Sequence, residues 1–119
     1  MAQHNELGLY GENEAVAYLL KKEYIILERN WRFLKAEVDI IAQIDNWLCI
    51  IEVKTRSSTQ FGNPESFIDY KKRQLLVAAA HEYVIQKDLD LEVRFDIISV
   101  IKRTNNVFLE HFIAAFNSF

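Results

Sequence analysis

The sequence predicts an α/β domain whose elements follow the order helix, three strands, loop, helix and two strands. Small and apolar residues recur at helical spacing in two stretches, 5–23 and 66–86. β-Branched and aromatic residues fill most of the stretches between and after them. The chain has 119 residues, of which 50% are hydrophobic, which is enough for one domain with its own core. We therefore expect residues 1–119 to fold as a single unit.

The first predicted helix carries a narrow stripe of small residues. At about 100° per residue, Gly8, Glu12, Ala15 and Leu19 align, with Gly11 beside them. A glycine inside a helix costs about 1 kcal/mol relative to alanine, so these glycines indicate close approach to a sheet. Glu12 is the odd member of the stripe, because charged residues are seldom buried without a partner or a task. We expect this helix to cover a sheet face that bears further carboxylates.

Turn-forming residues separate the predicted strands. Asp45-Asn46 suits a two-residue hairpin turn, and residues 104–106 (Thr-Asn-Asn) suit the last turn. Residues 56–65 are rich in breakers and predict an exposed loop, within which Asn63-Pro64 is a start signal for the second helix. The predicted strands are residues 24–33, 37–43, 47–54, 91–101 and 107–114.

The composition excludes several classes of protein. The chain has 14 Lys and Arg against 17 Asp and Glu, and this net charge of −3 excludes a polycationic nucleic-acid coat. Cys49 is the single cysteine, which excludes a disulfide scaffold and a zinc ribbon built on thiolates. The sequence has no apolar run long enough to span a membrane, and its opening residues lack the features of a secretory signal. We therefore expect a cytoplasmic protein without membrane contact.

The register of the middle hairpin brings charged residues together. With residues 45–46 as the turn, the next pair is Ile44 with Trp47. The same register places Asp39 opposite Glu52, and Glu37 opposite Lys54. Opposed residues share a face, with their Cβ atoms about 4.5–5.5 Å apart. The other face is wholly apolar and is predicted to be core: Val38, Ile40, Ala42, Cys49, Ile51 and Val53.

Two carboxylates held this close favour a cation site. At about 5 Å and an effective dielectric near 20, they repel by roughly 3 kcal/mol, so the pair needs a proton or a metal ion. Oxygen ligands favour Mg²⁺, Mn²⁺ or Ca²⁺ over zinc. Lys54 is placed to orient a water or to neutralise charge on a phosphate.

The alternative is a solvated salt-bridge face, because Glu-x-Lys is a common surface pattern on strands. Two features weigh against it. The charged face also carries the apolar residues Ile41, Leu48 and Ile50, and the first helix contributes the misplaced carboxylate of Glu12.

A series of short motifs runs through nearly the whole chain: Leu7-Gly8-x-x-Gly11-Glu12, Asn30-Trp31-Arg32, Glu37-Val-Asp39, Ile51-Glu52-Val-Lys54-Thr-Arg56, Phe61-Gly62, Lys71, Arg94-Phe95-Asp96 and His111. Taken together, these motifs resemble those of the YraN-like family, bacterial proteins of unassigned function also called uncharacterised protein family 0102. That family is similar to archaeal Holliday-junction resolvases and belongs with the restriction-endonuclease-like, PD-(D/E)xK nucleases.

The resemblance implies a single nuclease-like domain with a restriction-endonuclease-like sandwich, a mixed central β-sheet flanked by helices. It also implies a catalytic set of Asp39, Glu52, Lys54 and Glu12. Asp39, Glu52 and the carbonyl of Val53 would hold Mg²⁺ or Mn²⁺, with Glu12 as a further ligand, and Lys54 would position the attacking water.

The chain departs from the family pattern at two places. Ala36 stands where the family usually has glycine, and Val38 precedes Asp39 where a proline is common in the superfamily. The first departure bears on the local backbone rather than on the chemistry, and many superfamily members share the second.

Basic residues near these acids predict contact with DNA, branched or single-stranded. Arg56 and Lys71 flank the site and match family positions, and Arg32 and Lys72 belong to the same positive regions. Glu37 is expected to support the site from the same strand face. Arg94 and Asp96 share a strand face as a structural ion pair, and His111 is expected to contact a neighbour rather than to act in catalysis.

The leading hypothesis is therefore a Mg²⁺-dependent DNA endonuclease, similar to a resolvase. The second is a nucleic-acid-binding module of the same fold with little or no cleavage. The third is a small interaction protein unrelated to nucleic acid, which the acidic composition favours. The sequence leaves open the substrate's structure, the pathway, and whether the domain forms a homodimer.

Overall fold

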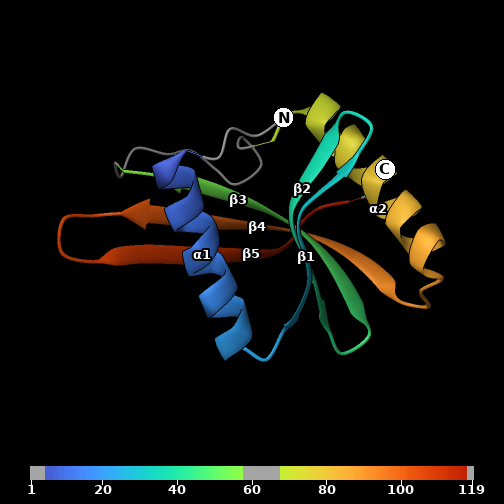
Figure 1. The fold of residues 1–119 in the computed structure, drawn as a ribbon, viewed down its shortest axis with the longest axis horizontal. Helices are drawn as coiled ribbons and strands as arrows, with labels where there is room; N and C mark the ends of the chain where they lie inside the picture. Colours follow the sequence, from blue (N-terminus) through green and yellow to red (C-terminus); the bar gives the residue numbers. More distant parts are fainter. Residues whose placement is uncertain (1–4, 58–67, 118–119) are drawn as a thin grey trace.

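The computed structural model describes residues 5–57 and 68–117. It has a five-stranded sheet in the order β1-β2-β3-β4-β5, in which β3 and β4 are parallel and the other neighbours are antiparallel. The elements are α1 (Glu6–Lys21), β1 (Ile25–Phe33), β2 (Ala36–Ile44), β3 (Trp47–Arg56), α2 (Tyr70–Lys87), β4 (Glu92–Lys102) and β5 (Val107–Phe116). The fold is thus a mixed α/β sandwich of the restriction-endonuclease-like type, as predicted (Figure 1).

Both helices begin at a polar cap. The side chain of Asn5 accepts from Gly8 N at 2.7 Å, and that of Asp69 accepts from Lys72 N at 2.8 Å. The second helix therefore starts at Tyr70, later than the sequence indicated. Arg56, expected to open the loop, is instead the last residue of β3. The remainder of that loop beyond residue 57, including Asn63-Pro64, lies outside the described residues.

The two helices lie over opposite faces of the sheet. Helix α1 packs Ala15 and Leu19 in a core cluster with Ile40 and Ile51. Helix α2 packs in a second cluster with Val38 and other strand residues, among them Ile41, Leu48 and Ile50. Contrary to expectation, Ala15 and Leu19 of α1 therefore cover the apolar face, whereas its first turns, with Gly8 and Glu12, reach Asp39 and Glu52 as expected. No helix in the described parts of the chain is long and apolar enough to cross a membrane.

The β2–β3 hairpin follows the predicted register only in part. Pairs run from Ile44 with Trp47 to Ile40 with Ile51, and there the pairing ends. Beyond it, β2 stays paired with β1 through residues 36–38 while leaving β3. Asp39 with Glu52 and Glu37 with Lys54 are therefore not strand pairs.

The separation of β2 from β3 also changes the face on which Val38 lies. This residue was expected to share the core face of Ile40, but it packs in the α2-side cluster while Ile40 packs in the α1-side cluster. Strand β2 thus rotates across Asp39, the residue between them. The result is a fork between β2 and β3, with Asp39 on one branch and Glu52 on the other.

Helix α1 touches β3 at Gly11. A Cβ atom built on Gly11 would lie 1.8 Å from Thr55 Oγ1, far inside van der Waals contact. Only a glycine allows the helix to sit this close, as the sequence indicated. The contact brings the first turns of α1, including Glu12, against the end of β3 that carries Glu52 and Lys54.

Candidate functional site

Asp39 and Glu52 are buried carboxylates at the fork in the sheet. Their exposed fractions are 8% and 7%. The Asp39 carboxylate Oδ2 accepts a hydrogen bond from Val53 N at 2.8 Å. In the regular ladder this N–H would bond to a backbone carbonyl of β2. The side chain of Asp39 therefore replaces the next backbone hydrogen bond between β2 and β3. This bond fixes its carboxylate beside Glu52.

The surroundings of Asp39 disfavour its ionised form. Burial and then the nearby Glu52 carboxylate raise the pKa of Asp39 to about 8, against the opposing effects of the Val53 N–H and of Lys72. Without a further cation, Asp39 therefore holds a proton near neutral pH. This electrostatic conflict agrees with the sequence analysis, although the acids are not a strand pair.

Glu52 has one engaged oxygen and one orphaned oxygen. Its Oε2 lies 2.5 Å from Lys72 Nζ on α2. Its Oε1 is buried and has no hydrogen-bond partner among the described residues. A buried carboxylate oxygen without a protein partner is costly and rare, and it is a suitable ligand atom for a cation.

The donor set around this oxygen suits a hard divalent cation. The N–H and C=O of one residue in an extended strand point to the same side, so the Val53 carbonyl faces the branch that carries Asp39. Within residues 5–57 and 68–117, no three Asp, Glu, His or Cys side chains form a ready-made metal cage. Mg²⁺ nevertheless commonly uses one or two carboxylates completed by waters. The residues present therefore fit Mg²⁺ or Mn²⁺.

Glu12 reaches the site from α1, but both of its carboxylate oxygens already accept hydrogen bonds from β1. Its Oε1 accepts from Arg29 Nη2 at 2.8 Å, and its Oε2 accepts from Asn30 Nδ2 at 2.9 Å. Glu12 lines one cavity with Asp39 and Glu52, as expected, although its charge is compensated by Arg29. The partners Arg29 and Asn30 were not predicted. The only sign of them in the sequence was the position of Glu12 on a face expected to be buried, where a carboxylate needs a partner.

The α1-side cavity, of about 240 Å³, contains the predicted catalytic set. Its lining includes Glu12, Asp39, Glu52 and Lys54. Arg56, at the end of β3, lines it as well, so this predicted DNA contact lies next to the acids.

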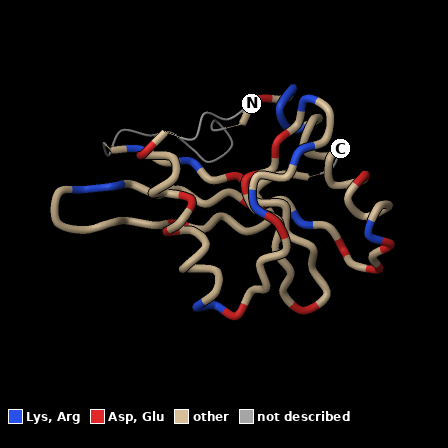
Figure 2. The backbone as a smooth tube through the Cα atoms, in the orientation of Figure 1, with Lys and Arg blue, Asp and Glu red and all other residues tan. Residues whose placement is uncertain are grey.

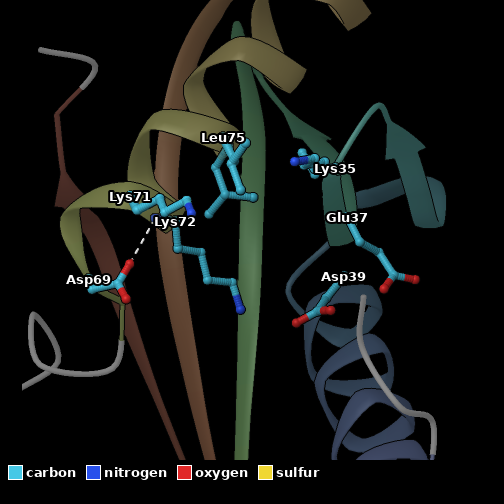
Figure 3. Close-up of a pocket in the computed structure, with 9 residues that line it drawn as sticks. Lys35, Glu37, Asp39, Asp69, Lys71, Lys72 and Leu75 are labelled. Carbon is cyan, nitrogen blue, oxygen red and sulfur yellow. Dashed lines mark hydrogen bonds between the residues drawn. The ribbon is translucent and has the colours of Figure 1, made fainter.

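A second cavity, of about 330 Å³, lies on the α2 side of Asp39 (Figure 3). Asp39 lines both cavities, so it lies where they adjoin. The α2-side cavity is lined mainly by charged residues from the β1–β2 turn, β2 and the start of α2: Lys35, Glu37, Asp39, Asp69, Lys71 and Lys72. Figure 2 shows lysines and arginines close to acidic residues around that turn and the first turn of α2.

The predicted DNA-contact residues therefore divide between the two cavities. Arg56 lines the α1-side cavity, whereas Lys71 and Lys72 line the α2-side cavity. Arg32 lies on β1, half-exposed, with its Nε 4.0 Å from Glu37 Oε2. Glu37 lines the α2-side cavity together with Asp39.

A separate buried network joins α1, β4 and β5. Asp96 is fully buried and accepts from Arg94, from His111 Nε2 at 2.8 Å and from Ala114 N at 3.0 Å. Although burial raises the pKa of Asp96, these hydrogen bonds from His111 and Arg94 hold it below its usual value. His111 Nδ1 also lies 3.0 Å from the Tyr18 hydroxyl. The Arg94–Asp96 ion pair was predicted, and the complete network was not.

Fold and site together define a class: an α/β sandwich with two buried acids and a lysine at a split in its mixed sheet. Within that class, the chain belongs to the uncharacterised protein family UPF0102, whose profile matches residues 11–100. A UPF0102 protein of Flavobacterium psychrophilum is 58% identical over all 119 residues and over its own full length. Relatives in Christiangramia forsetii and Bacteroides thetaiotaomicron are 55% and 49% identical over 116 residues, and each alignment covers at least 96% of both chains. The family resemblance is thereby confirmed.

Proposed function

We propose that this protein is a cytoplasmic, Mg²⁺- or Mn²⁺-dependent endodeoxyribonuclease that hydrolyses phosphodiester bonds in DNA. One observation carries the proposal: two buried acids share a fork in the sheet, and a buried oxygen of Glu52 has no partner among the described residues. The pKa of Asp39 is raised by burial and by Glu52, and strongly perturbed acids that line a cavity are typical of functional sites.

The residues of the α1-side cavity would have three roles: binding the ion, orienting the water and contacting the phosphate. Asp39, Glu52 and the Val53 carbonyl would hold the ion, with Glu12 as the further ligand that the family resemblance implies. A bound divalent ion supplies a Lewis acid for the scissile phosphate and lowers the pKa of a water. Lys54 lines the same cavity and would orient that water, and Arg56 would contact a phosphate beside it.

The substrate is proposed to be DNA, branched or single-stranded. Lys71 and Lys72 line the adjoining cavity, and Arg32 is half-exposed on β1. These cations would contact the phosphate backbone, which fixes the position of the strand without reading its sequence. Such contacts give binding that weakens steeply with salt.

The second candidate is a nucleic-acid-binding module without cleavage. It is favoured by the occupied oxygens of Glu12 and by the Lys72 ammonium on Glu52, since both reduce the free ligand atoms at the site.

A cleavage panel separates the two candidates. End-labelled duplex, flap, four-way junction and single-stranded DNA are incubated with Mg²⁺ or Mn²⁺. We expect cleavage of at least one substrate, lost with EDTA and lost in Asp39→Asn, while Asp39→Asn still binds DNA. Asp90→Asn makes the same chemical change at an exposed position and should cleave like the parent. Binding without cleavage by the parent would support the module, and equal cleavage by Asp39→Asn would remove Asp39 from the mechanism.

A further inference from the structure

Lys72 is the one residue of α2 that makes an ion pair with the paired acids among the residues described. The N-cap of Asp69 fixes the first turn of α2, because Asp69 accepts from the backbone N–H of Lys72. The side chain then extends away from the helix across the α2-side cavity. Figure 3 shows its amine directed toward Asp39, and Nζ lies 2.5 Å from Glu52 Oε2.

The Lys72 ammonium partly neutralises the charge of the two acids. Asp39 and Glu52 are both more than 90% buried, and when both are ionised their mutual repulsion needs a positive charge. Lys72 supplies one charge, but it engages only one oxygen of Glu52 and leaves Oε1 without a partner. A lysine therefore satisfies the acids incompletely.

The position of Lys72 also allows it to leave. The Lys72 side chain is 45% exposed, whereas that of Glu52 is 8% exposed. A lysine side chain is long and flexible and carries a strongly hydrated charge, so its amine can swing into water while its stem stays packed. A divalent ion held by Glu52 would repel the ammonium, and both cations favour the same carboxylate.

We propose that Lys72 is a displaceable internal counter-ion, which occupies Glu52 in the metal-free protein and is expelled when a divalent cation binds there. This inference rests on the proposed metal site. The expelled amine lies in the cavity that also contains Lys35 and Lys71, where it becomes free for a phosphate of the nucleic acid. Metal binding then couples to the positive charge that the α2-side cavity presents to DNA.

The proposal requires that Lys72 and the metal compete. Removal of the lysine should therefore tighten metal binding, by roughly tenfold if the coupling has a typical size. General loss of positive charge near the site would also tighten binding slightly. Lys35→Met controls for this effect, because Lys35 lines the same cavity and, among the described residues, makes no ion pair with Asp39 or Glu52.

The experiment is a calorimetric titration with Mn²⁺ of the parent, Lys72→Met, Lys72→Gln and Lys35→Met, with thermal melts of each protein with and without the ion. We expect about tenfold tighter binding and a larger metal-induced rise in Tm for both Lys72 variants, and less than about twofold change for Lys35→Met. Two Lys72 variants are used so that a folding defect in one leaves the test standing.

The outcomes separate this inference from the proposed function. If the parent binds Mn²⁺ and neither Lys72 variant binds it more tightly than Lys35→Met does, Lys72 is not a competitor and the metal site stands. If neither the parent nor the Lys72 variants bind Mn²⁺, the metal site itself is wrong and the inference falls with it.

Discussion

At the scale of the residue, Asp39 has two roles that depend on each other. Its carboxylate accepts the Val53 N–H in place of a backbone carbonyl of β2, and the same hydrogen bond holds it beside Glu52. The sequence predicted that the two acids are close, because the turn at residues 45–46 alone defines which residues of the hairpin lie opposite each other. It could not predict the fork, because a sequence pattern assumes that a strand continues with its pairing unchanged.

Glu12 illustrates what a single position can reveal. Its place on a small-residue stripe marked it as unusual, but its partners Arg29 and Asn30 come from β1. That contact depends on how α1 crosses the sheet. Tertiary placement, rather than local sequence, determines it.

The raised pKa of Asp39 predicts a pH dependence of stability. Asp39 has a pKa of about 8 when folded, whereas an aspartate in an unfolded chain has a pKa of about 3.9, so between these values the folded state binds more protons than the unfolded state. The contribution of Asp39 to the free energy of unfolding is therefore fully present below about pH 4 and is lost as the pH rises to about 8.

Thermal melts in EDTA from pH 5 to pH 9 test this dependence. The parent should lose stability relative to Asp39→Asn as the pH rises, because only the parent gains a buried charge. Parallel pH profiles of the two proteins would show that Asp39 ionises freely in the folded state.

Lys54 is expected to matter for catalysis far more than for stability. Its side chain is only half-buried, so Lys54→Ala should cost no more than about 1 kcal/mol in unfolding free energy. Loss of a group that positions the water should reduce cleavage by about 100-fold or more. Urea denaturation and single-turnover cleavage measure the two effects, with Lys21→Ala as a surface control. Parent-like cleavage by Lys54→Ala would exclude it from the mechanism.

At the scale of the element, α1 and α2 deliver different parts of the site. The stripe on α1 correctly indicated a close approach to the sheet, since helical spacing and glycine both act locally. The face that most of α1 covers was assigned wrongly, because Ala15 and Leu19 pack on the apolar face with Ile40 and Ile51. The start of α2 depends on the cap at Asp69, and the sequence upstream offered a competing signal at Asn63-Pro64.

The contact between α1 and β3 should not tolerate a methyl group at Gly11. In Gly11→Ala the new Cβ would meet Thr55 Oγ1 at 1.8 Å, so the helix or the strand must shift. We expect a loss of about 1–3 kcal/mol in unfolding free energy, typical of overpacking, together with weaker metal binding because Glu52 and Lys54 lie on the same strand.

A double-mutant cycle with Thr55→Ala, followed by urea denaturation, tests the cause. Thr55→Ala removes the Oγ1 and Cγ2 atoms that the new methyl group would meet, so the double variant should recover part of the loss. Additive effects of the two substitutions would mean that Gly11 is needed for another reason.

At the scale of the whole molecule, the site exists because the sheet is mixed. Strand β3 pairs with β2 on one side near the turn and with β4 along its whole length on the other. It can therefore carry Glu52, Val53 and Lys54 past the point where β2 departs. Hairpin neighbours were predictable from short turns. The parallel pairing of β3 with β4 follows only from the crossover through α2, which no short-range pattern encodes.

We propose that the fork between β2 and β3 is a divalent cation site that depends on Asp39. An ion that binds only the folded protein stabilises it by RT ln(1 + [L]/Kd), about 1.4 kcal/mol at ten times Kd. For a domain of this size, that should raise Tm by roughly 5 °C. Asp39→Asn lacks the buried charge, so in EDTA at pH 8 it should melt at least as high as the parent. Its response to metal should largely vanish because it lacks one anionic ligand.

The most direct test is therefore a thermal melt of the parent and of Asp39→Asn at pH 8, in EDTA and in millimolar Mg²⁺ or Mn²⁺. The predicted result is a metal-induced rise in Tm for the parent and almost none for Asp39→Asn. An unchanged Tm for the parent, or an equal rise in both proteins, would show that the paired acids do not form a metal site.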